Sequence, residues 1–473
     1  MYSMIFLAAA SFALTLILTP LFRSLAFWLK LVDEPDHNRK IHSVPIPRIG
    51  GVAIAVAVVG AFGLLFLFRL KAGLLLSADA PFALRLLPAI TVIFFVGLVD
   101  DITPIPPMFK LGGQIVAAIL AWESGIHLSS IGMHNFPVIL SFILTIIWIV
   151  ACSNAMNLID GVDGLAAGVG LVASVTTLIA ALLHRNIELA FATVPLVGAL
   201  LGFLRFNFSP ASIFLGDCGS LTLGFLLGCY GLVWSEKSTT LLSMVAPLIV
   251  LFVPLLDASL AIVRRFLRQR PIFSADRGHI HHKMLSQGLP PWRVVLILYG
   301  FCGLAGVAAL ILTAKQIPYH SFVVIIVLLI AWLAIQNLGY SELSVASKVI
   351  FGGGFHKLLN GQLNLVKFEQ ELMASDTLEE IWELLCRDSP EFGFSAVELR
   401  IDDEVQLRRT GKGWQIRVDF PGRGYIVLKR ASGSRRGSSA GVLFVDCIER
   451  VIFNRLDELK PRVSELQAYA QAD

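Results

Sequence analysis

The sequence contains few charged residues. Asp, Glu, Lys and Arg make up 15% of its 473 residues, whereas hydrophobic residues make up 56%. Soluble domains usually carry about 25% charged residues, so this composition excludes an ordinary soluble protein and indicates a polytopic membrane protein. The net charge of +4 comes with no basic stripe and no nucleic-acid-binding module, so we expect no nucleic-acid partner.

The sequence also lacks closely spaced cysteines, and we see no cleavage signature after its first apolar run. Its six cysteines are scattered, which disfavours a disulfide framework or a metal–thiolate site and favours small apolar packing: Cys152, Cys218, Cys229, Cys302, Cys386 and Cys447. The first apolar run, from about residue 4 to residue 22, ends without a small-residue cleavage signature. We therefore expect it to remain as the first helix.

Long apolar runs dominate the first 340 residues. Eleven of them approach the length of about 20 residues that a spanning helix needs: 3–22, 49–68, 86–101, 109–122, 137–152, 165–183, 188–206, 220–235, 240–263, 294–313 and 320–338. Alternate loops hold most of the Lys and Arg residues, which marks those loops as cytoplasmic and the N-terminus as external. The predicted fold is an all-α polytopic membrane protein with ten to eleven spans.

The composition changes after Leu338. Residues 339–473 are mixed and charged, with helical spacing over 376–388 and 441–459 and strand-like alternation over 394–401, 414–420 and 424–429. This pattern predicts a small cytoplasmic α/β domain, whose element order faintly resembles half of a GAF-type sensor domain. A ligand sensor, a docking or regulatory module and a structural appendage all stay open.

Four polar motifs stand at the ends of the expected spans, and the predicted orientation puts all of them on the cytoplasmic side. Carboxylates are costly near hydrocarbon, so acids in such places are functional candidates. The candidates are Asp100 and Asp101; Asn154, Asn157, Asp160 and Asp163; Asp217; and Arg277 with His279, His281 and His282. Their shared side predicts one common active site.

The acidic motifs have local explanations as well as functional ones. Two adjacent carboxylates at a helix end are a polar stop, or a pair that needs a metal or Lys110 to stay ionised. The Asn/Asp repeat is a set of capped turns, or an oxygen-rich site for a hard cation with phosphates or for a hydroxyl-rich, base-bearing substrate. Asp217 caps the following helix, or binds there for function.

The histidine motif lacks a zinc-binding pattern, because no carboxylate or thiolate completes a tetrahedral set. Next to arginines it is typical of a clamp for phosphates or sugar, although loop histidines without a role are the alternative. The loop over residues 33–51 contains Arg39, Lys40, His42 and Arg48 and either anchors the protein at the membrane surface or borders the site. Carboxylates for a metal and cations for phosphates together predict Mg²⁺-assisted phosphoryl chemistry on a lipid.

These motifs resemble, as a set, the polyprenyl-phosphate N-acetylhexosamine-1-phosphate transferases (the WecA and MraY type). The resemblance covers about residues 1–340 and rests on Arg39-Lys40-Ile41-His42 with Gly50-Gly51, and on the acidic and histidine motifs above. It implies transfer of a sugar-1-phosphate from a UDP-sugar to a polyprenyl phosphate, with release of UMP. The spacing His-x-His-His is closer to the N-acetylglucosamine branch than to the N-acetylmuramoyl-pentapeptide branch. The domain after Leu338 departs from the usual short members.

The resemblance implies roles for individual residues. Mg²⁺, with Mn²⁺ as a substitute, is assigned to Asp217 with help from Asn157, and the lipid phosphate to Asp100 and Asp101. Asp160 belongs to the catalytic set and lines the nucleotide site. The implied substrate-binding residues are Lys110, Asn154, Asp163, Arg277, His279, His281 and His282. Direct attack by the carrier phosphate and a covalent aspartyl intermediate both remain open.

The same resemblance implies a bacterial inner-membrane enzyme in the synthesis of cell-envelope polysaccharide such as lipopolysaccharide O-antigen. Its implied partners are a UDP-N-acetylhexosamine and the lipid carrier, and a homodimer and a cytoplasmic partner for the last domain stay open. The competing hypothesis is a transporter or flippase for a phosphorylated lipid or sugar. Asp257, inside the ninth expected span, fits that alternative better, unless it lies near the cytoplasmic end of the span.

Overall fold

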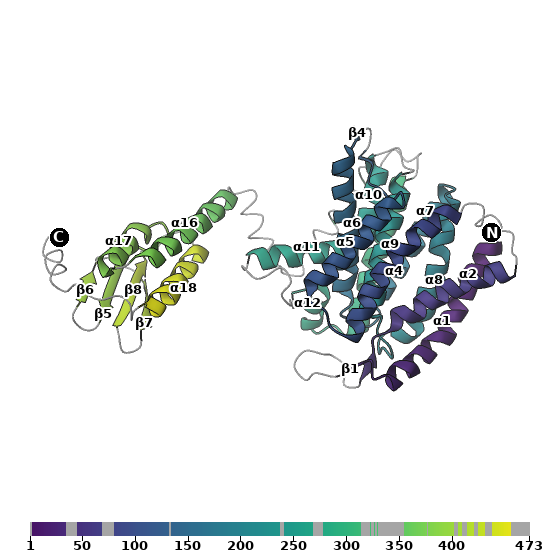
Figure 1. Cartoon of the computed structure of the whole chain (residues 1–473), viewed down its shortest axis with the longest axis horizontal. Helices are drawn as coiled ribbons and strands as arrows, with labels where there is room; N and C mark the ends of the chain where they lie inside the picture. The colour runs from purple at the N-terminus through teal and green to yellow at the C-terminus, as the bar shows by residue number, and fades with distance from the viewer. Residues whose placement is uncertain are drawn as a thin grey trace. The chain divides into compact units, whose positions relative to one another are not determined.

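The protein is described here by a computed structural model that divides into two compact units, residues 1–340 and 341–473 (Figure 1). The described residues are 2–34, 45–68, 80–131, 134–236, 241–267, 278–313, 354–375, 377–401, 405–408, 414–420, 424–430 and 438–455, with Phe322, Ile326 and Leu329. The first unit is a bundle of helices, and the second contains a small sheet with helices. This confirms the predicted fold class.

The described helices of the first unit are α1 (Tyr2–Trp28), α2 (Gly50–Leu67), α4 (Ala80–Ile102), α5 (Pro107–Glu123), α6 (Val138–Ile159), α7 (Leu165–Leu183), α8 (Ile187–Asn207), α9 (Gly216–Glu236), α10 (Leu241–Val250), α11 (Phe252–Leu267), α12 (Ile280–Ser286) and α13 (Pro291–Thr313). Two antiparallel strand pairs lie between helices: β1 (Val32–Asp33) with β2 (Ile46–Pro47), and β3 (Ser130–Ile131) with β4 (His134–Asn135).

Seven of the described helices are long and apolar enough to cross a membrane: α1, α2, α6, α7, α8, α9 and α13. The protein is therefore a multi-pass membrane protein. Helices α4 and α5 coincide with two further expected spans, and α5 has 17 residues. The expected span over 320–338 lies outside the described residues except for Phe322, Ile326 and Leu329.

The ninth expected span, 240–263, is wrong as a single helix. The chain forms α10 and then α11, with a break at Leu251. Pro254 explains the break, because it has no N–H to donate to the carbonyl of Val250, four residues earlier. The amphipathic α11 runs at a steep angle to the bundle helices in Figure 1.

Helix α9 occupies the middle of the bundle. Of its most apolar stretch 83% is buried, compared with 22% for α1. Glycines bring its neighbours close: a Cβ on Gly51 of α2 would lie 2.3 Å from the Gly219 nitrogen, and one on Gly97 of α4 would lie 2.5 Å from the Asp217 carbonyl oxygen. Small residues allow such backbone contact between membrane helices. The start of α9 is thereby fixed against the ends of its neighbours.

The second unit contains an antiparallel sheet in the order β6-β5-β8-β7. Its strands are β5 (Ala396–Ile401), β6 (Val405–Arg408), β7 (Trp414–Phe420) and β8 (Gly424–Arg430), and its helices are α16 (Gly354–Ala374), α17 (Leu378–Asp388) and α18 (Ser438–Arg455). The sequence predicted three of the strands and the last two helices, but it missed β6 and α16. With four residues, β6 is too short for alternation to show.

One face of this sheet carries the core of the second unit. Leu399 pairs with Ile426 in the register of β5 and β8, and both side chains are buried. They join one apolar cluster with Phe368 of α16, Leu385 of α17 and Phe444 of α18. Alternate residues on the strands point to the other face, as the period of two requires.

Candidate functional site

Lys110 joins two acids that come from different helices. Its Nζ lies 2.6 Å from Asp100 Oδ2, at the end of α4, and 2.6 Å from Asp217 Oδ2, in the first turn of α9. The side chains of Lys110, Asp100 and Asp217 are 23%, 13% and 26% exposed, respectively. They are therefore held by one another and still accessible to a ligand. Lys110 supplies the positive charge that the sequence required near the acid pair.

The two adjacent acids have different partners. Asp101 accepts the backbone N–H of Asp217 with Oδ1, at 2.7 Å, and that of Cys218 with Oδ2, at 2.9 Å. These are first-turn N–H groups of α9, which have no partner within the helix. Asp101 thus caps α9 from the end of α4. The Asp217 side chain binds Lys110 and lies inside the first turn of the helix.

Backbone contacts hold the loop before α2 against the same helix end. The Gly51 nitrogen donates to the Leu215 carbonyl at 2.8 Å. Gly216 has a φ of +76°, and a Cβ there would lie 1.9 Å from the carbonyl oxygen of Arg48, so only glycine fits. The Arg48 side chain forms an ion pair with Asp33. The described part of the 33–51 loop therefore borders the site, whereas Arg39, Lys40 and His42 lie outside the described residues.

The end of α6 presents two asparagines to different neighbours. Asn157 donates through Nδ2 to Ser220 Oγ at 3.0 Å, one turn after Asp217 on α9. Its Oδ1 is the oxygen that a cation would use. Asn154 exchanges amide hydrogen bonds with Gln114 of α5, at 2.5 and 3.3 Å, and also donates to its own helix. This pairing joins α5 to α6 beside the site.

The turn between α6 and α7 carries the other two acids. Asp160 ends α6, and Gly164 has a φ of +77° just before α7 begins. Asp163 Oδ2 accepts the N–H of Ala211 at 2.9 Å, and the Tyr299 hydroxyl donates to the Gly164 carbonyl at 2.5 Å. The turn is thus irregular, and two distant segments hold it.

Asp160 lies in a region of excess negative charge. Burial raises the pKa of Asp160 well above its usual range, and the charges of Asp217 and Asp101 raise it further, whereas Arg48 lowers it. Lys110 is already shared between two carboxylates. A divalent cation would relieve this excess of negative charge.

The histidine motif reaches the same turn. His281 is 1% exposed, and its Nε2 would lie 3.1 Å from a Cβ on Gly161. Burial, helped by the neighbouring His282 and His279, lowers the pKa of His281 to about 3, although the charge of Asp257 opposes this shift. The ring is therefore neutral at neutral pH. His279 stacks parallel to it at 5.6 Å, and the His282 ring lies 4.4 Å away. Arg277 lies outside the described residues.

The oxygen ligands at α9 suit magnesium. Among the residues that the structure describes, no three His, Cys, Asp or Glu side chains gather closely enough to hold a metal by themselves. Mg²⁺ does not need such a cage, because it binds one or two protein oxygens together with water and substrate phosphates. Asp217 and the Asn157 amide oxygen fit that pattern and would hold the ion.

Three further residues support the site, and sequence reasoning missed two of them, Gln114 and Tyr299. Gln114 was detectable as a polar residue within an expected span. Asp257 was noted as the residue that fits transport better, but its carboxylate binds His279 and the N–H of Ile280. That pairing removes the observation that favoured a transporter. Tyr299 gave no signal, because its bond to Gly164 spans 135 residues.

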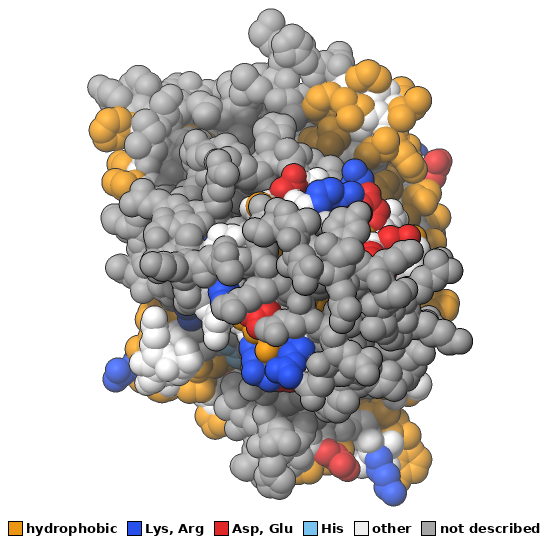
Figure 2. Space-filling model, turned by 90° about the vertical axis from the view of Figure 1, so that its left-hand side faces the viewer, with side chains coloured by type: hydrophobic (Ala, Val, Ile, Leu, Met, Phe, Trp, Pro, Cys, Tyr) orange, Lys and Arg blue, Asp and Glu red, His pale blue; other side chains and the backbone are white. Residues whose placement is uncertain are grey.

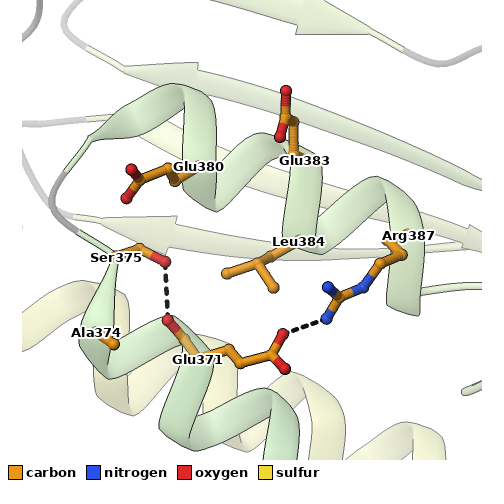
Figure 3. Close-up of a pocket in the computed structure, with 7 residues that line it drawn as sticks. All are labelled: Glu371, Ala374, Ser375, Glu380, Glu383, Leu384 and Arg387. Atoms are coloured by element: carbon orange, nitrogen blue, oxygen red, sulfur yellow. Dashed lines mark hydrogen bonds and ion pairs between the residues drawn. The ribbon is translucent and has the colours of Figure 1, made fainter.

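The second unit has an open groove of about 530 Å³ between α16 and α17 (Figure 3). Arg387 forms an ion pair with Glu371 across it and a second with Asp388. The groove also contains Glu380 and Glu383, which project away from that pair in Figure 3. The Arg387 side chain is 56% exposed, so the groove is open to solvent.

The fold and the site together define a multi-pass membrane protein with a lysine-bridged acidic centre where several helices end. Comparison with known proteins gives the family. Residues 83–235, which include every acidic motif, match Glycosyl transferase family 4. A probable undecaprenyl-phosphate N-acetylglucosaminyl 1-phosphate transferase of Bacillus subtilis is 34% identical over 329 residues, or 66% of this chain and 86% of that protein.

Two further relatives are also described as transferases of this kind. A decaprenyl-phosphate N-acetylglucosaminephosphotransferase of Mycobacterium tuberculosis is 36% identical over 314 residues, or 61% of this chain and 77% of that protein. A phospho-N-acetylmuramoyl-pentapeptide-transferase of Shouchella clausii is 29% identical over 323 residues, or 63% of this chain and 94% of that protein. The chain belongs to the family of polyprenyl-phosphate N-acetylhexosamine-1-phosphate transferases, which confirms the predicted resemblance.

Proposed function

We propose that this protein transfers N-acetylglucosamine-1-phosphate from its UDP-sugar to a polyprenyl phosphate and releases UMP. The observation that carries the proposal is the bridge from Asp100 through Lys110 to Asp217. It joins, within one site, a carboxylate for the acceptor, a cation for phosphate oxygens and a carboxylate for a metal. Phosphoryl transfer depends on such positioning and charge neutralisation.

In this proposal an oxygen of the lipid phosphate forms a bond to the β-phosphorus of the donor. The bond from that phosphorus to the bridging oxygen breaks, and UMP leaves with the electron pair. Asp100 orients the acceptor phosphate and accepts its proton where one is present, while Lys110 attracts the phosphate oxygens. Mg²⁺ bound by Asp217 and Asn157 would supply the positive charge that stabilises the diphosphate and the leaving UMP. Asp101 keeps the start of α9 in place.

The choice of substrates rests on the relatives. The Bacillus subtilis and Mycobacterium tuberculosis relatives are described as N-acetylglucosamine transferases that act on undecaprenyl and decaprenyl phosphate. The spacing His279-Ile280-His281-His282 favours the same sugar. Since the site lies where helices end, a lipid phosphate would approach it from the membrane surface.

Turnover by the purified full chain tests the proposal. UMP release would be measured in detergent with polyprenyl phosphate, Mg²⁺ and a panel of UDP-N-acetylhexosamines, and repeated with Mn²⁺. We expect release that needs lipid and metal together and is fastest with UDP-N-acetylglucosamine. Folded protein that releases no UMP with any donor would refute the proposal.

We also propose the bacterial cytoplasmic membrane as the location, with the site on its cytoplasmic side. Basic residues such as Arg205, Arg264 and Arg293 lie in the loops or helix ends on the side of the acidic motifs, which supports this orientation. Single cysteines placed at exposed Met108 and Trp292 would be labelled by a membrane-impermeant reagent only in opened cells. Labelling of these cysteines in intact cells would show that the site faces the outside and would refute the proposed orientation.

A further inference from the structure

Asp257 is a buried carboxylate whose two oxygens serve different groups. It lies in α11, is 1% exposed, and is 22 residues from the histidine that it binds. Oδ2 lies 2.9 Å from His279 Nδ1, and Oδ1 accepts the N–H of Ile280 at 2.8 Å. A buried charge is expensive unless it is paired and hydrogen-bonded. The bundle thus places this carboxylate where it fixes the start of the histidine motif.

Helix α11 holds the same segment at a second point. Arg264, seven residues after Asp257 and 3% exposed, packs against Gly278, where a Cβ would lie 2.3 Å from the guanidinium carbon. Residues seven apart lie on one face of a helix. One face of α11 therefore contacts both Gly278 and His279, and Figure 1 shows α11 and α12 near one another. The position of the His279 ring is set by a rigid element.

The carboxylate decides which ring nitrogen a ligand can use. A carboxylate at Nδ1 accepts a hydrogen bond, so Nδ1 carries the proton and Nε2 is the nitrogen left for another partner. The His279 ring stacks on His281, with 3° between their planes, and His281 abuts Gly161 beside Asp160. The oriented histidine therefore belongs to the wall of the acidic site.

We propose that Asp257 is a positioning residue for the donor nucleotide-sugar and acts through His279. It holds the imidazole with Nδ1–H toward α11, so that Nε2 accepts a hydrogen bond from a hydroxyl or amide of the bound sugar. This inference rests on the proposed function for its substrate. The orientation of His279 does not depend on that function.

The variants Asp257→Asn and Asp257→Ala distinguish this role from simple capping of α12. Asp257→Asn keeps an oxygen for the Ile280 N–H but places an NH₂ group against His279 Nδ1, which favours the wrong tautomer. Asp257→Ala removes both interactions. A capping role predicts near wild-type activity for the asparagine variant and loss only for alanine. Our proposal predicts that both lower kcat/KM for the UDP-sugar, by about 10–100-fold, with the asparagine variant keeping the wild-type melting temperature.

A double-mutant cycle with His279→Ala tests whether the effect passes through the histidine. We expect Asp257→Asn to change kcat/KM by less than about twofold when His279 is already alanine, because coupled residues are non-additive. KM for the lipid phosphate should change far less than KM for the donor. Effects that multiply in the double variant, or an asparagine variant as active as the wild type, would overturn the proposal.

The tautomer itself can be measured without turnover and without changing Asp257. Nitrogen-15 spectra of the full chain labelled in histidine, assigned through loss of the His279 signal in His279→Ala, should show His279 protonated at Nδ1. A neutral His279 protonated at Nε2 overturns the proposal even if the enzyme is active. The Nδ1–H form in a protein that releases no UMP would refute the proposed function and leave the positioning by Asp257 intact.

Discussion

In the membrane unit the charged groups of the site hold one another within the bundle, whereas most of the ion pairs described in the C-terminal unit include a side chain that is more than half exposed. Lys110 binds two acids from separate helices, and the carboxylate of Asp257 is 1% exposed. In the other unit, Arg417 binds Asp419 with both side chains more than half exposed. Figure 2 shows blue basic side chains beside red acidic ones on the face that it presents.

This difference distinguishes charges that support chemistry from charges that keep a surface soluble. An exposed ion pair contributes about 0–1 kcal/mol, because water screens it and the side chains lose freedom. A buried charge that loses its partner costs about 3–5 kcal/mol. Charges are kept within a membrane bundle despite that cost, so the residues around Lys110 are the ones to test for function.

The largest effect is expected at Asp217. Asp217→Asn should lower kcat by about 10²–10³-fold, because the site loses the carboxylate that would hold the metal and, with the metal, the positive charge that would stabilise the transition state. Asp419→Asn is the matched control, since it also removes a carboxylate paired with a basic residue but on the C-terminal surface. UMP release by both purified variants is the measurement. Similar losses of UMP release in the two variants would contradict the distinction between catalytic charges in the membrane unit and surface charges in the C-terminal unit.

Gly51→Ala should destabilise the membrane unit by about 1–3 kcal/mol, the usual cost of overpacking. Its new Cβ would meet backbone atoms of Gly219 at 2.3 Å, so α2 would have to move away from α9. Gly63→Ala, in the same helix, has no atom within 4 Å of the new Cβ. Melting temperatures in detergent should fall for Gly51→Ala only; equal melting temperatures would contradict the close packing.

Asp101→Ala should cost about 1–2 kcal/mol of stability, because two first-turn N–H groups of α9 lose their acceptor. Asp100→Ala should affect turnover mainly, since Asp100 accepts one backbone N–H, that of Ile105. Thermal unfolding and UMP release of both variants separate a capping acid from one that contacts substrate. A lower melting temperature for Asp100→Ala than for Asp101→Ala would reverse this assignment.

His281 should make the membrane unit sensitive to acid. The pKa of His281 is about 3 in the folded protein, below its ordinary value of 6.5. Between these values the unfolded chain binds a proton that the folded protein does not, so stability is lost as pH falls below about 6.5, by at most about 1.4 kcal/mol per pH unit. The melting temperature of the wild type should fall more between pH 7 and pH 5 than that of His281→Gln. An equal fall in melting temperature for both proteins would show that His281 is not neutral and buried in the folded protein.

Arg387→Ala should have the smallest effect, at most about 1 kcal/mol on the C-terminal unit and none on turnover. Arg387 is 56% exposed, although its partners Glu371 and Asp388 are partly buried. The buried control is Leu385→Ala in the same helix, which should cost about 2–5 kcal/mol by opening a cavity. A large loss of turnover in Arg387→Ala would indicate that the groove in Figure 3 controls the membrane unit.

Prediction from the sequence succeeded where a property is local. Apolar runs gave the helices of the bundle, and alternation gave β5, β7 and β8. It failed at Leu251, because a proline within a hydropathic run does not lower the average that defines a span. It also left the role of Asp257 undecided, since an acid in an apolar segment looks the same whether it lines a pathway or binds a histidine.

By itself, the sequence determined that the protein is a membrane protein and that its acidic motifs stand at helix ends, because hydropathy and motif spacing are properties of chain order. Only the tertiary structure decided that Asp100 shares Lys110 with Asp217, that Asp101 caps α9 and that Asp257 orients His279. Lys110 and Asp217 are 107 residues apart, and their contact exists because glycines let α9 pack closely among its neighbours. Hydrogen bonds act over about 3 Å, so the role of each acid follows from that packing.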